Sequence, residues 1–335
     1  MLQKKVPLHL ALLFSIVSIV ASWLLLSYRY KIDKEKTLEA ASGKTSETCL
    51  FDIKRLGGYD YIRPFLYADR PCQSEKLLPV KNQIENLINN YKLSGTINSA
   101  SVYLRRLNQG EWISAGDAET FNPGSLLKVP ELITFFKMNE KTPGLLDRKI
   151  SYSTPLNIPK KVIFTSKSIE LGKTYTIREL LYYMIAYSDN NATMLLNQRM
   201  DIGIFQKIFT DLGLPKPDLT QTDIPITAKD YSYFMRVLYS ASYLNTEDSE
   251  YCTELLSHSD FVQGMLKGLP KDTKAAHKFG EAGDGINAYF SESGIIYIHN
   301  SPYLLTVMTK GKDNTILPVV ISDISQKIYY MINAI

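Results

Sequence analysis

The chain opens with a long uncharged stretch. From Val6 to Tyr28 there is no Asp, Glu, Lys or Arg, and 23 residues exceed the roughly 20 that a helix needs to cross a bilayer. No convincing small-x-small cleavage site precedes the aromatic and basic stretch from Tyr28 to Lys31, so we expect an uncleaved membrane anchor over residues 1–30. Basic residues flank both ends of the stretch, and the positive-inside rule therefore leaves the orientation open.

Residues 31–76 are predicted to form a polar spacer and a cysteine-containing segment. Asp33 to Thr48 is rich in Lys, Glu, Ser and Thr and has no apolar period, which is typical of a solvated linker. Cys49 and Cys72 can close a disulfide in an oxidising compartment, whereas Cys252 lies in a helical pattern and is expected to be a buried thiol. Without a C-x-x-C pair or a His at metal-ligand spacing, the sequence predicts no metal site.

Regular apolar periods begin at Leu77. Residues Leu77–Leu93 place apolar side chains at helical spacing, and Ser94-Gly95 ends this predicted amphipathic helix. Ala100–Leu107 and Trp112–Ala115 read as strands on either side of a glycine-containing loop, which predicts a β-hairpin.

Helical periods then dominate until Asp260, and strand periods return after it. The predicted helices are Thr176–Tyr187, Ala192–Met200, Ile204–Leu212, Ala228–Leu244 and Asp248–Ser257. The later strands are Ala275–Gly280, Ala288–Ile298 and Tyr303–Thr309, followed by a last helix over Ile316–Ile332. This order predicts an α+β domain over residues 77–335, in which both ends of the domain share one sheet and a helical lobe interrupts it.

Composition and charge exclude several classes of protein. With 45% apolar and 21% charged residues, the chain is expected to fold rather than to be disordered. The net charge of +4 comes without any run of five or six like charges, so nothing indicates a nucleic-acid partner. Arg105 and Arg106 are adjacent in a strand and face opposite sides, which predicts that they are solvated or paired. The 22 tyrosines are dispersed at core-like positions, which favours packing over a stacking surface.

A serine and a lysine one helical turn apart are the first candidates for chemistry. Pro123-Gly124 breaks the chain before Ser125, and helical spacing runs from there to Met138, so a helix is expected to open at the serine. A serine hydroxyl is a weak nucleophile until a base takes its proton, and Lys128 points from the same face. Apolar neighbours favour burial of this lysine, which would lower its pKa. Ser-x-x-Lys alone is common by chance.

Two further motifs follow in order along the chain. Ser188-Asp189-Asn190 comes directly after a predicted helix and delivers a second hydroxyl and an amide at its end. His277-Lys278-Phe279-Gly280 lies in a strand-like segment, where glycine permits close approach of the backbone. Ser-x-x-Lys, Ser-Asp-Asn and Lys-x-Gly are the motif set of penicillin-binding proteins and class A β-lactamases. With the phrases PGSLLKVP, YSDNNA, SGIIYIHN and YLLTVMTKG, the chain resembles class A β-lactamase-like serine hydrolases from roughly Leu77 to its end.

The resemblance implies a fold and a mechanism. The fold is a five-stranded antiparallel sheet flanked by helices, with an inserted all-helical lobe and the active site in the cleft between them. Ser125 would attack the substrate carbonyl, Lys128 would accept its proton, and Ser188 would pass a proton to the leaving nitrogen. Asn190 would hydrogen-bond the side-chain amide of the substrate.

The resemblance also assigns the third motif and the oxyanion hole. Lys278 would bind the substrate carboxylate and raise the local positive potential, with Gly280 beside it in the substrate-binding strand. The backbone amides of Ser125 and Glu281 would form the oxyanion hole, where each donor is typically worth about 3 kcal/mol.

The sequence departs from the family pattern at two places. Phe279 stands where the third motif normally has a hydroxyl residue that contacts the substrate carboxylate. The Glu-x-x-Leu-Asn phrase that activates the deacylating water in class A β-lactamases is missing, and the corresponding stretch, 212–227, has only Asp218 and Asp223 as carboxylates. We therefore expect an acyl-enzyme that forms but clears slowly, with Asp223 as the candidate substitute base.

Histidine chemistry is a weaker interpretation. His277 would need a nucleophilic serine, and no Gly-x-Ser-x-Gly elbow surrounds any serine. His9, His258 and His299 have no obvious catalytic partner in sequence. We expect all four to be structural.

The sequence therefore predicts a single-pass membrane protein with an extracytoplasmic serine hydrolase domain. It would act without a cofactor on β-lactams or on D-Ala-D-Ala-type cell-wall peptides. The alternative is a membrane-tethered, non-catalytic relic of the fold that binds cell-wall peptide or a protein partner without turnover.

Overall fold

The computed structural model describes residues 25–29, 49, 51–116, 119–156, 164, 166–221, 223–283, 286–298 and 301–334. The chain divides into two compact units, Met1–Leu50 and Phe51–Ile335. In the first unit residues 25–29 are helical, and most of the predicted anchor and spacer lies outside the described residues, as do His9 and His299. Among the residues that are described, no helix combines the length and the apolar character needed to cross a bilayer.

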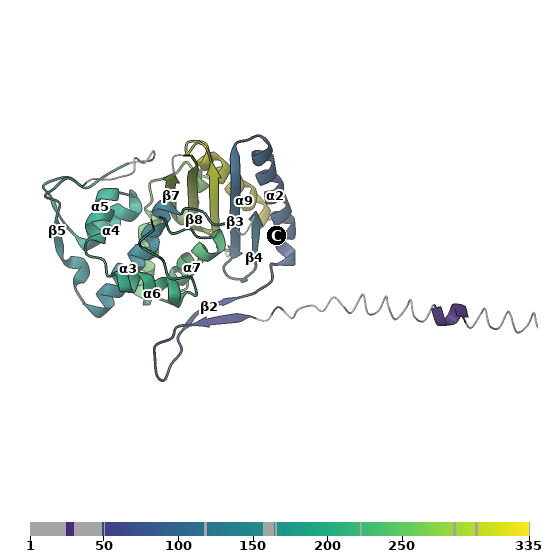
Figure 1. The fold of residues 1–335 in the computed structure, drawn as a ribbon, viewed down its shortest axis with the longest axis horizontal. Helices are drawn as coiled ribbons and strands as arrows, with labels where there is room; N and C mark the ends of the chain where they lie inside the picture. Colours follow the sequence, from purple (N-terminus) through teal and green to yellow (C-terminus); the bar gives the residue numbers. More distant parts are fainter. Residues whose placement is uncertain are drawn as a thin grey trace, which may run out of the picture. The chain divides into compact units, whose positions relative to one another are not determined.

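A five-stranded antiparallel sheet forms the centre of the second unit (Figure 1). Its strands are β3 (Ile97–Arg106), β4 (Trp112–Gly116), β7 (Lys274–Gly283), β8 (Ala288–Tyr297) and β9 (Tyr303–Gly311). Their order is β4-β3-β9-β8-β7, so the early hairpin pairs with the last strand and Val102 lies opposite Val307. The predicted sheet, shared by both ends of the domain, is confirmed, and β7 is one of its edges.

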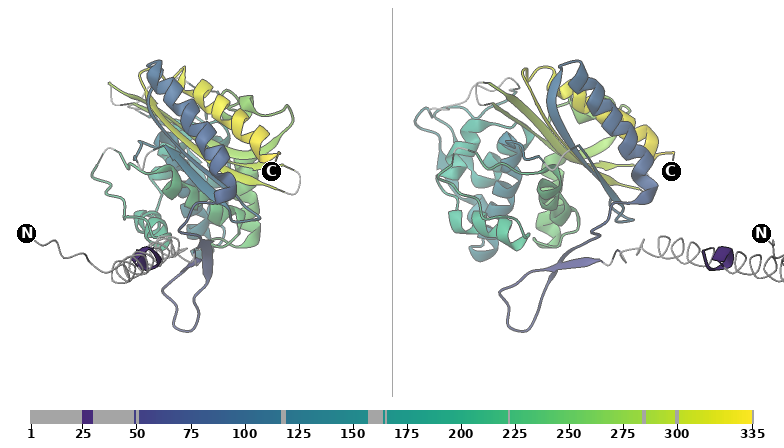
Figure 2. Two further views of the ribbon diagram at one scale, coloured as in Figure 1. Left: turned by 90° about the vertical axis from the view of Figure 1, so that its right-hand side faces the viewer. Right: turned by 45° about the vertical axis from the view of Figure 1, so that its right-hand side comes forward.

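Two long helices cover one face of this sheet (Figure 2). They are α2 (Leu78–Leu93) and α9 (Leu317–Ile332), and both have a proline in the first turn, where the missing N–H breaks no helical hydrogen bond. In α2 the buried side chains are Val80, Ile84 and Ile88, which recur every four residues and so lie on one stripe. The amphipathic pattern of the sequence therefore placed this helix correctly.

The helical lobe lies on the other side of the sheet (Figure 2). Its helices are α3 (Lys128–Lys141), α4 (Ile177–Ala186), α5 (Asn190–Asn197), α6 (Ile202–Asp211), α7 (Ala228–Tyr239) and α8 (Thr246–Ser257). Short elements complete the unit: η1 (Glu75–Leu77), η2 (Gly124–Leu127), η3 (Leu145–Asp147), η4 (Met265–Gly268) and the pair β5 (Lys149–Ser151) and β6 (Thr174–Thr176). Helices α7 and α8 contact β9 and β7, respectively, and join the lobe to the sheet.

Side-chain caps fix where the lobe helices begin. Thr176 forms a capping box with Glu179 at α4, and Asp189, Asp201 and Thr227 accept backbone N–H bonds at the starts of α5, α6 and α7. Each such cap is worth about 1 kcal/mol. The helix predicted to run to Leu244 ends at Tyr239 instead.

The segment before the predicted domain start also contains ordered structure. Strands β1 (Asp52–Arg55) and β2 (Phe65–Asp69) form an antiparallel hairpin, which the sequence pattern did not predict. Leu66 is fully buried, and the Tyr67 hydroxyl donates a 2.7 Å hydrogen bond to the Leu212 carbonyl. Within this unit the hairpin therefore packs against the helical lobe. The predicted thiol chemistry is confirmed: Cys49 and Cys72 are disulfide-bonded, and Cys252 is free and buried.

A buried charge cluster ties the hairpin to the core. Asp69 of β2 accepts a 2.8 Å bond from Arg105 of β3 and lies 3.5 Å from Arg236 of α7. The exposed fractions of these residues are 7%, 6% and 4%. Both guanidinium groups also donate to the Ala68 carbonyl. Arg105 and Arg106 were predicted to be solvated or paired, and both are paired. Arg105 bonds Asp69, and Arg106 bonds Glu111 at 2.9 Å.

Removing the charge of Asp69 should destabilise the fold. Asp69→Asn leaves two buried guanidinium groups without their counter-charge, and breaking such a pair costs about 3–5 kcal/mol. Urea unfolding of the purified protein measures the difference. Asp60→Asn, an exposed change in the loop of the same hairpin, should stay within about 0.5 kcal/mol. Equal stability of the two variants would contradict the assigned role.

Candidate active site

The candidate nucleophile sits in a tight turn rather than in the helix proper. Ser125 lies in η2, and α3 begins three residues later at Lys128. The Tyr231 hydroxyl of α7 donates a 2.9 Å bond to the Leu126 carbonyl and fixes this turn from the lobe side. The helix predicted to open at the serine therefore does so through one 3₁₀ turn.

Two glycines allow the edge strand β7 to lie against the serine turn. A Cβ on Gly280 would stand 2.1 Å from the Pro123 carbonyl oxygen, and one on Gly124 would stand 2.3 Å from the Glu281 carbonyl oxygen. Gly124 also has φ = 52°, in the left-handed region that glycine adopts without strain. The glycine of the third motif thus has a packing reason here: any side chain would push the strand away from the nucleophile.

Lys128 is buried and binds the second motif. Only 3% of its surface is exposed, and its Nζ donates to the Ser188 carbonyl (2.6 Å), the Ser188 Oγ (3.2 Å) and the Asn190 Oδ1 (2.8 Å). The Ser125 hydroxyl lines the same pocket, without a hydrogen bond to Lys128 in this free state. Catalytic hydrogen bonds are often long before substrate binds.

A second buried lysine reaches the same hydroxyl from the sheet. Lys278 has no exposed surface, and its Nζ donates to the Ser188 Oγ (2.9 Å) and to the Phe279 carbonyl (2.8 Å). The structure therefore brings all three motifs together, with the Ser188 hydroxyl as their meeting point.

The electrostatics of this cluster favour a neutral lysine. Burial lowers the pKa of Lys128, while the carboxylates of Glu131 and Asp189 oppose this shift. Burial also lowers the pKa of Lys278 well below its usual value, and the positive charge of Lys128 lowers it further. Two ammonium groups on one hydroxyl repel each other. The site thus favours the unprotonated amine that a base requires.

The second motif is held in a strained conformation by its neighbours. Ser188 has φ = 53°, a region that costs a non-glycine residue about 1–3 kcal/mol. Asp189 stabilises it by accepting bonds from the backbone of Asn191 and Ala192 at the start of α5. The same carboxylate also accepts from the Ser168 hydroxyl. Asp189 is thus structural, and it orients Ser188 and Asn190 toward Lys128.

A cavity of about 230 Å³ opens in front of the nucleophile. It is lined by Asn122, Gly124, Ser125, Leu127, Lys128, Glu131, Asn190, Thr193, Asp223, Ile224 and Glu281. Of the predicted site residues, four line it: Ser125, Lys128, Asn190 and Glu281. Ser188 is buried and bonds Lys128, and Lys278 is buried and bonds Ser188. Gly280 lies in β7 against the serine turn. Sequence reasoning missed Asn122, Glu131 and Thr193. Glu131 left one signal, because it repeats the three-residue spacing of Ser125 and Lys128.

The two loop carboxylates have different positions. Asp218 is exposed and accepts bonds from the Thr220 backbone and hydroxyl, as in a local turn. Asp223 lines the cavity, and its Oδ1 accepts from the Asn122 side chain, which in turn accepts from the Gly124 N–H. Asp223 thus supports the loop that enters the serine turn.

Phe279 belongs to an aromatic cluster beside the site. Its ring stacks on Phe261, with 4.2 Å between centroids, and lies parallel to Phe290 at 5.8 Å. The Nζ of Lys278 lies 4.0 Å from the centre of the Phe279 ring. An aromatic face therefore takes the place of the hydroxyl that the family pattern has at this position.

His277 is structural in this arrangement. Its Nδ1 lies 2.8 Å from the Glu292 Oε1, and both side chains are buried. Glu292 also accepts a bond from the Met265 N–H. The imidazole thus pairs with a carboxylate inside the sheet domain rather than with a serine.

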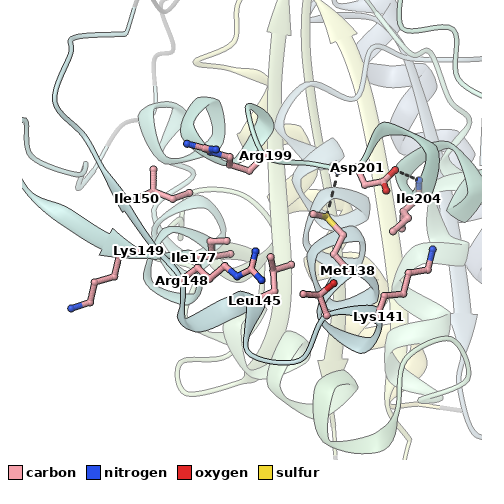
Figure 3. A pocket seen from close by; sticks show the side chains of 11 residues that line it. Met138, Lys141, Leu145, Arg148, Lys149, Ile150, Ile177, Arg199, Asp201 and Ile204 are labelled. Atoms are coloured by element: carbon pink, nitrogen blue, oxygen red, sulfur yellow. Dashed lines mark hydrogen bonds between the residues drawn. The ribbon is translucent and has the colours of Figure 1, made fainter.

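A separate cavity of about 450 Å³ lies in the helical lobe (Figure 3). Its basic residues are Lys141, Arg148, Lys149 and Arg199, and none of the motif residues lines it. In Figure 3 Lys149 points away from the other side chains, so the cations do not converge on one point. Among the described residues, no group of three or more His, Cys, Asp or Glu side chains is placed to hold a metal ion.

Solved structures of this fold come from penicillin-binding proteins and β-lactamases. PBP-A superposes with a TM-score of 0.65 at 20% identity, covering 79% of this chain and 99% of PBP-A. A PBP-A variant in an acyl-enzyme complex with penicillin G superposes with a TM-score of 0.63 at 22% identity, covering 77% of this chain and 98% of the variant. The class A β-lactamase of Mycobacterium abscessus superposes with a TM-score of 0.64 at 19% identity, covering 76% of this chain and 99% of the β-lactamase. No curated protein matches the chain in sequence.

The sequence profile described as the Beta-lactamase enzyme family matches residues 79–332. That range includes the whole sheet, the helical lobe and all three motifs. The predicted resemblance and its extent are confirmed. The chain belongs to the β-lactamase enzyme family of serine hydrolases.

Proposed function

We propose that this chain forms an acyl-enzyme through Ser125 with β-lactams or with D-Ala-D-Ala-type cell-wall peptides. The observation that carries the proposal is the convergence of Lys128 and Lys278 on the Ser188 hydroxyl, beside the cavity that Ser125 lines. A structural serine and lysine would not require two desolvated amines at one hydroxyl. Such desolvation is how proteins make lysine a base at neutral pH.

Acylation follows from the positions of these groups. The Ser125 Oγ attacks the substrate carbonyl carbon while Lys128 takes the hydroxyl proton. Lys128 and Ser188 share a hydrogen bond, so the proton passes through the Ser188 Oγ to the leaving nitrogen as the C–N bond breaks. The N–H groups of Ser125 and Glu281 stabilise the oxyanion. The Asn190 amide holds the substrate chain at the cavity edge.

Phe279 bears on substrate choice. A hydroxyl at this position would add a hydrogen bond to the substrate carboxylate, whereas the ring offers only an apolar face. Lys278 then remains the side chain of this motif that can donate a hydrogen bond to the carboxylate. The same observation favours the second candidate, a relic that binds cell-wall peptide without turnover, and the labelling experiment below separates the two.

We place the domain outside the cytoplasm, tethered by the N-terminal stretch. The uncharged residues Val6–Tyr28 support a membrane anchor. The Cys49–Cys72 disulfide supports an oxidising compartment. Both fit an enzyme that meets cell-wall peptide.

Labelled penicillin should mark Ser125 covalently. Intact-mass measurement of the wild-type protein should show one adduct, and Ser125→Ala should show none because the attacking oxygen is gone. Ser240→Ala, an exposed serine at the end of α7, serves as the matched control and should label like the wild type. Absence of the adduct from the wild type would favour the non-catalytic alternative.

Acylation should depend on a neutral Lys128. Lys128→Ala should slow labelling by about 100-fold or more, whereas Lys137→Ala on the same helix should not. Because only the unprotonated amine takes a proton, the wild-type rate should fall as the pH drops below the lowered pKa of Lys128. Rapid-quench labelling across a pH series measures both effects. A rate in Lys128→Ala within about threefold of the wild type would contradict the base role, since general bases contribute far more.

The close approach of β7 should be required for acylation. In Gly280→Ala the new methyl would stand 2.1 Å from the Pro123 oxygen, and a displacement of the strand should slow labelling on the order of 100-fold. Gly283→Ala is the matched control on the same strand, because its methyl would stand 3.3 Å from the Asn287 carbonyl oxygen. Penicillin labelling rates and thermal unfolding of both variants provide the test. Similar rates in the two variants would argue against this constraint.

A further inference from the structure

A glutamate on α3 lies in the candidate active site without a role in acylation. Glu131 follows Lys128 by one helical turn, is only 9% exposed, and lines the same cavity of about 230 Å³ as Ser125. Its Oε2 is buried, and no group within the described part of the chain hydrogen-bonds it. A side-chain hydrogen bond from Asn197 of α5 holds the carboxylate.

An unpartnered carboxylate oxygen on the buried face of a helix needs a physical explanation. Burying a charged group without full pairing costs several kcal/mol, and an apolar side chain at this position would pack without that penalty. Native proteins satisfy most buried polar atoms, and the exceptions often have a catalytic role or bind an ordered water. Here the free oxygen belongs to a residue that lines the cavity in front of the nucleophile.

We propose that Glu131 is the general base for the water that hydrolyses the acyl-Ser125 ester. This inference rests on the proposed acyl-enzyme function and deepens it. The loop of this chain lacks the Glu-x-x-Leu-Asn carboxylate, and α3, which begins three residues after the nucleophile, supplies a carboxylate to the same cavity. Ser125, Lys128 and Glu131 follow one another at three-residue spacing.

The hydrolytic step balances in atoms and protons. The Glu131 carboxylate takes a proton from water, and the water oxygen forms a bond to the ester carbonyl carbon. Glu131 passes this proton to the neutral amine of Lys128. As the bond between the carbonyl carbon and the Ser125 Oγ breaks, Lys128 donates the proton to the Oγ, which restores the free enzyme and releases the acid product.

The pKa shifts of Glu131 and Lys128 reduce the free-energy cost of moving the proton between them. Burial raises the pKa of Glu131, and the Lys128 charge and the Asn197 bond oppose that shift. Burial lowers the pKa of Lys128. The two values therefore move toward each other, and general acid–base catalysis works best with pKa values near the operating pH. The other charged groups around the pair are Asp189 and Lys278, both near Lys128, and Asp223 across the cavity.

Asp223 is the rival carboxylate in the cavity. Its Oδ1 accepts from the Asn122 side chain, which also fixes the Gly124 backbone. That bonding gives Asp223 a role in positioning the serine turn. Glu131 has the unpartnered oxygen and the electrostatic coupling to Lys128.

A pulse–chase experiment with labelled penicillin tests the proposal on the full chain. The wild type, Glu131→Gln, Asp223→Asn and Glu140→Gln are labelled, excess label is removed, and adduct loss is followed by intact mass. Glu131→Gln should still form the adduct, because Ser125 and Lys128 are intact, but should release it about 100-fold or more slowly than the wild type. Glu140→Gln changes an exposed glutamate at the end of the same helix and should behave like the wild type.

Other results of the pulse–chase experiment would contradict either the role of Glu131 or the acyl-enzyme function. Equal adduct lifetimes in Glu131→Gln and the wild type, a lengthened lifetime in Asp223→Asn alone, or a wild-type adduct that never clears would each overturn the proposal. No adduct on the wild type would refute the acyl-enzyme function itself. If Glu131→Gln does not fold, the wild-type pH profile decides. Adduct release should slow as the pH falls through the raised pKa of Glu131, about 7, because the protonated carboxyl cannot act as a base, and a flat profile would overturn the role.

Discussion

The site depends on two buried lysines that share one serine hydroxyl. Lys128 from the helical lobe and Lys278 from the sheet both donate to the Ser188 Oγ, so this oxygen joins the two halves of the domain. Neither amine has water to stabilise its charge, and their mutual repulsion adds to the cost. The backbone of Ser188 adds strain of its own, and Asp189 holds this segment in place through the start of α5. A weakened junction here would release both lysines and the nucleophile together.

The sequence predicted those parts of the molecule whose signals are local. Helix α2, the early hairpin and the three motifs each have an apolar period or a short phrase within a few residues, and the structure places them as expected. The β1–β2 hairpin has no such signal, since both strands are short and β1 is largely exposed. Its stability comes from Asp69 pairing with Arg105 and Arg236, which are far away along the chain.

The same distinction applies within the active site. Ser125, Lys128, Ser188 and Lys278 were identified by motif, and the structure brings their elements together. Glu131 follows Lys128 by three residues in the sequence, but a glutamate at helical spacing is usually solvated. Only its burial and its unpartnered oxygen set it apart, and both depend on how α3 packs in the lobe.

The position of a deacylating carboxylate affects how the site can vary. A base on a loop depends on the conformation of that loop, whereas a side chain on a packed helix is held by the rotamers of its neighbours. Helix α3 is buried from Lys128 through Phe136, so a carboxylate there keeps a fixed place relative to Ser125. The loop between α6 and α7 then does not have to supply the base for deacylation, and Asp223 can support the serine turn through Asn122. The nucleophile lies in the 3₁₀ turn that leads into α3, and its base and the water-activating group lie on α3 itself, so acylation and hydrolysis would share the geometry of this turn and helix.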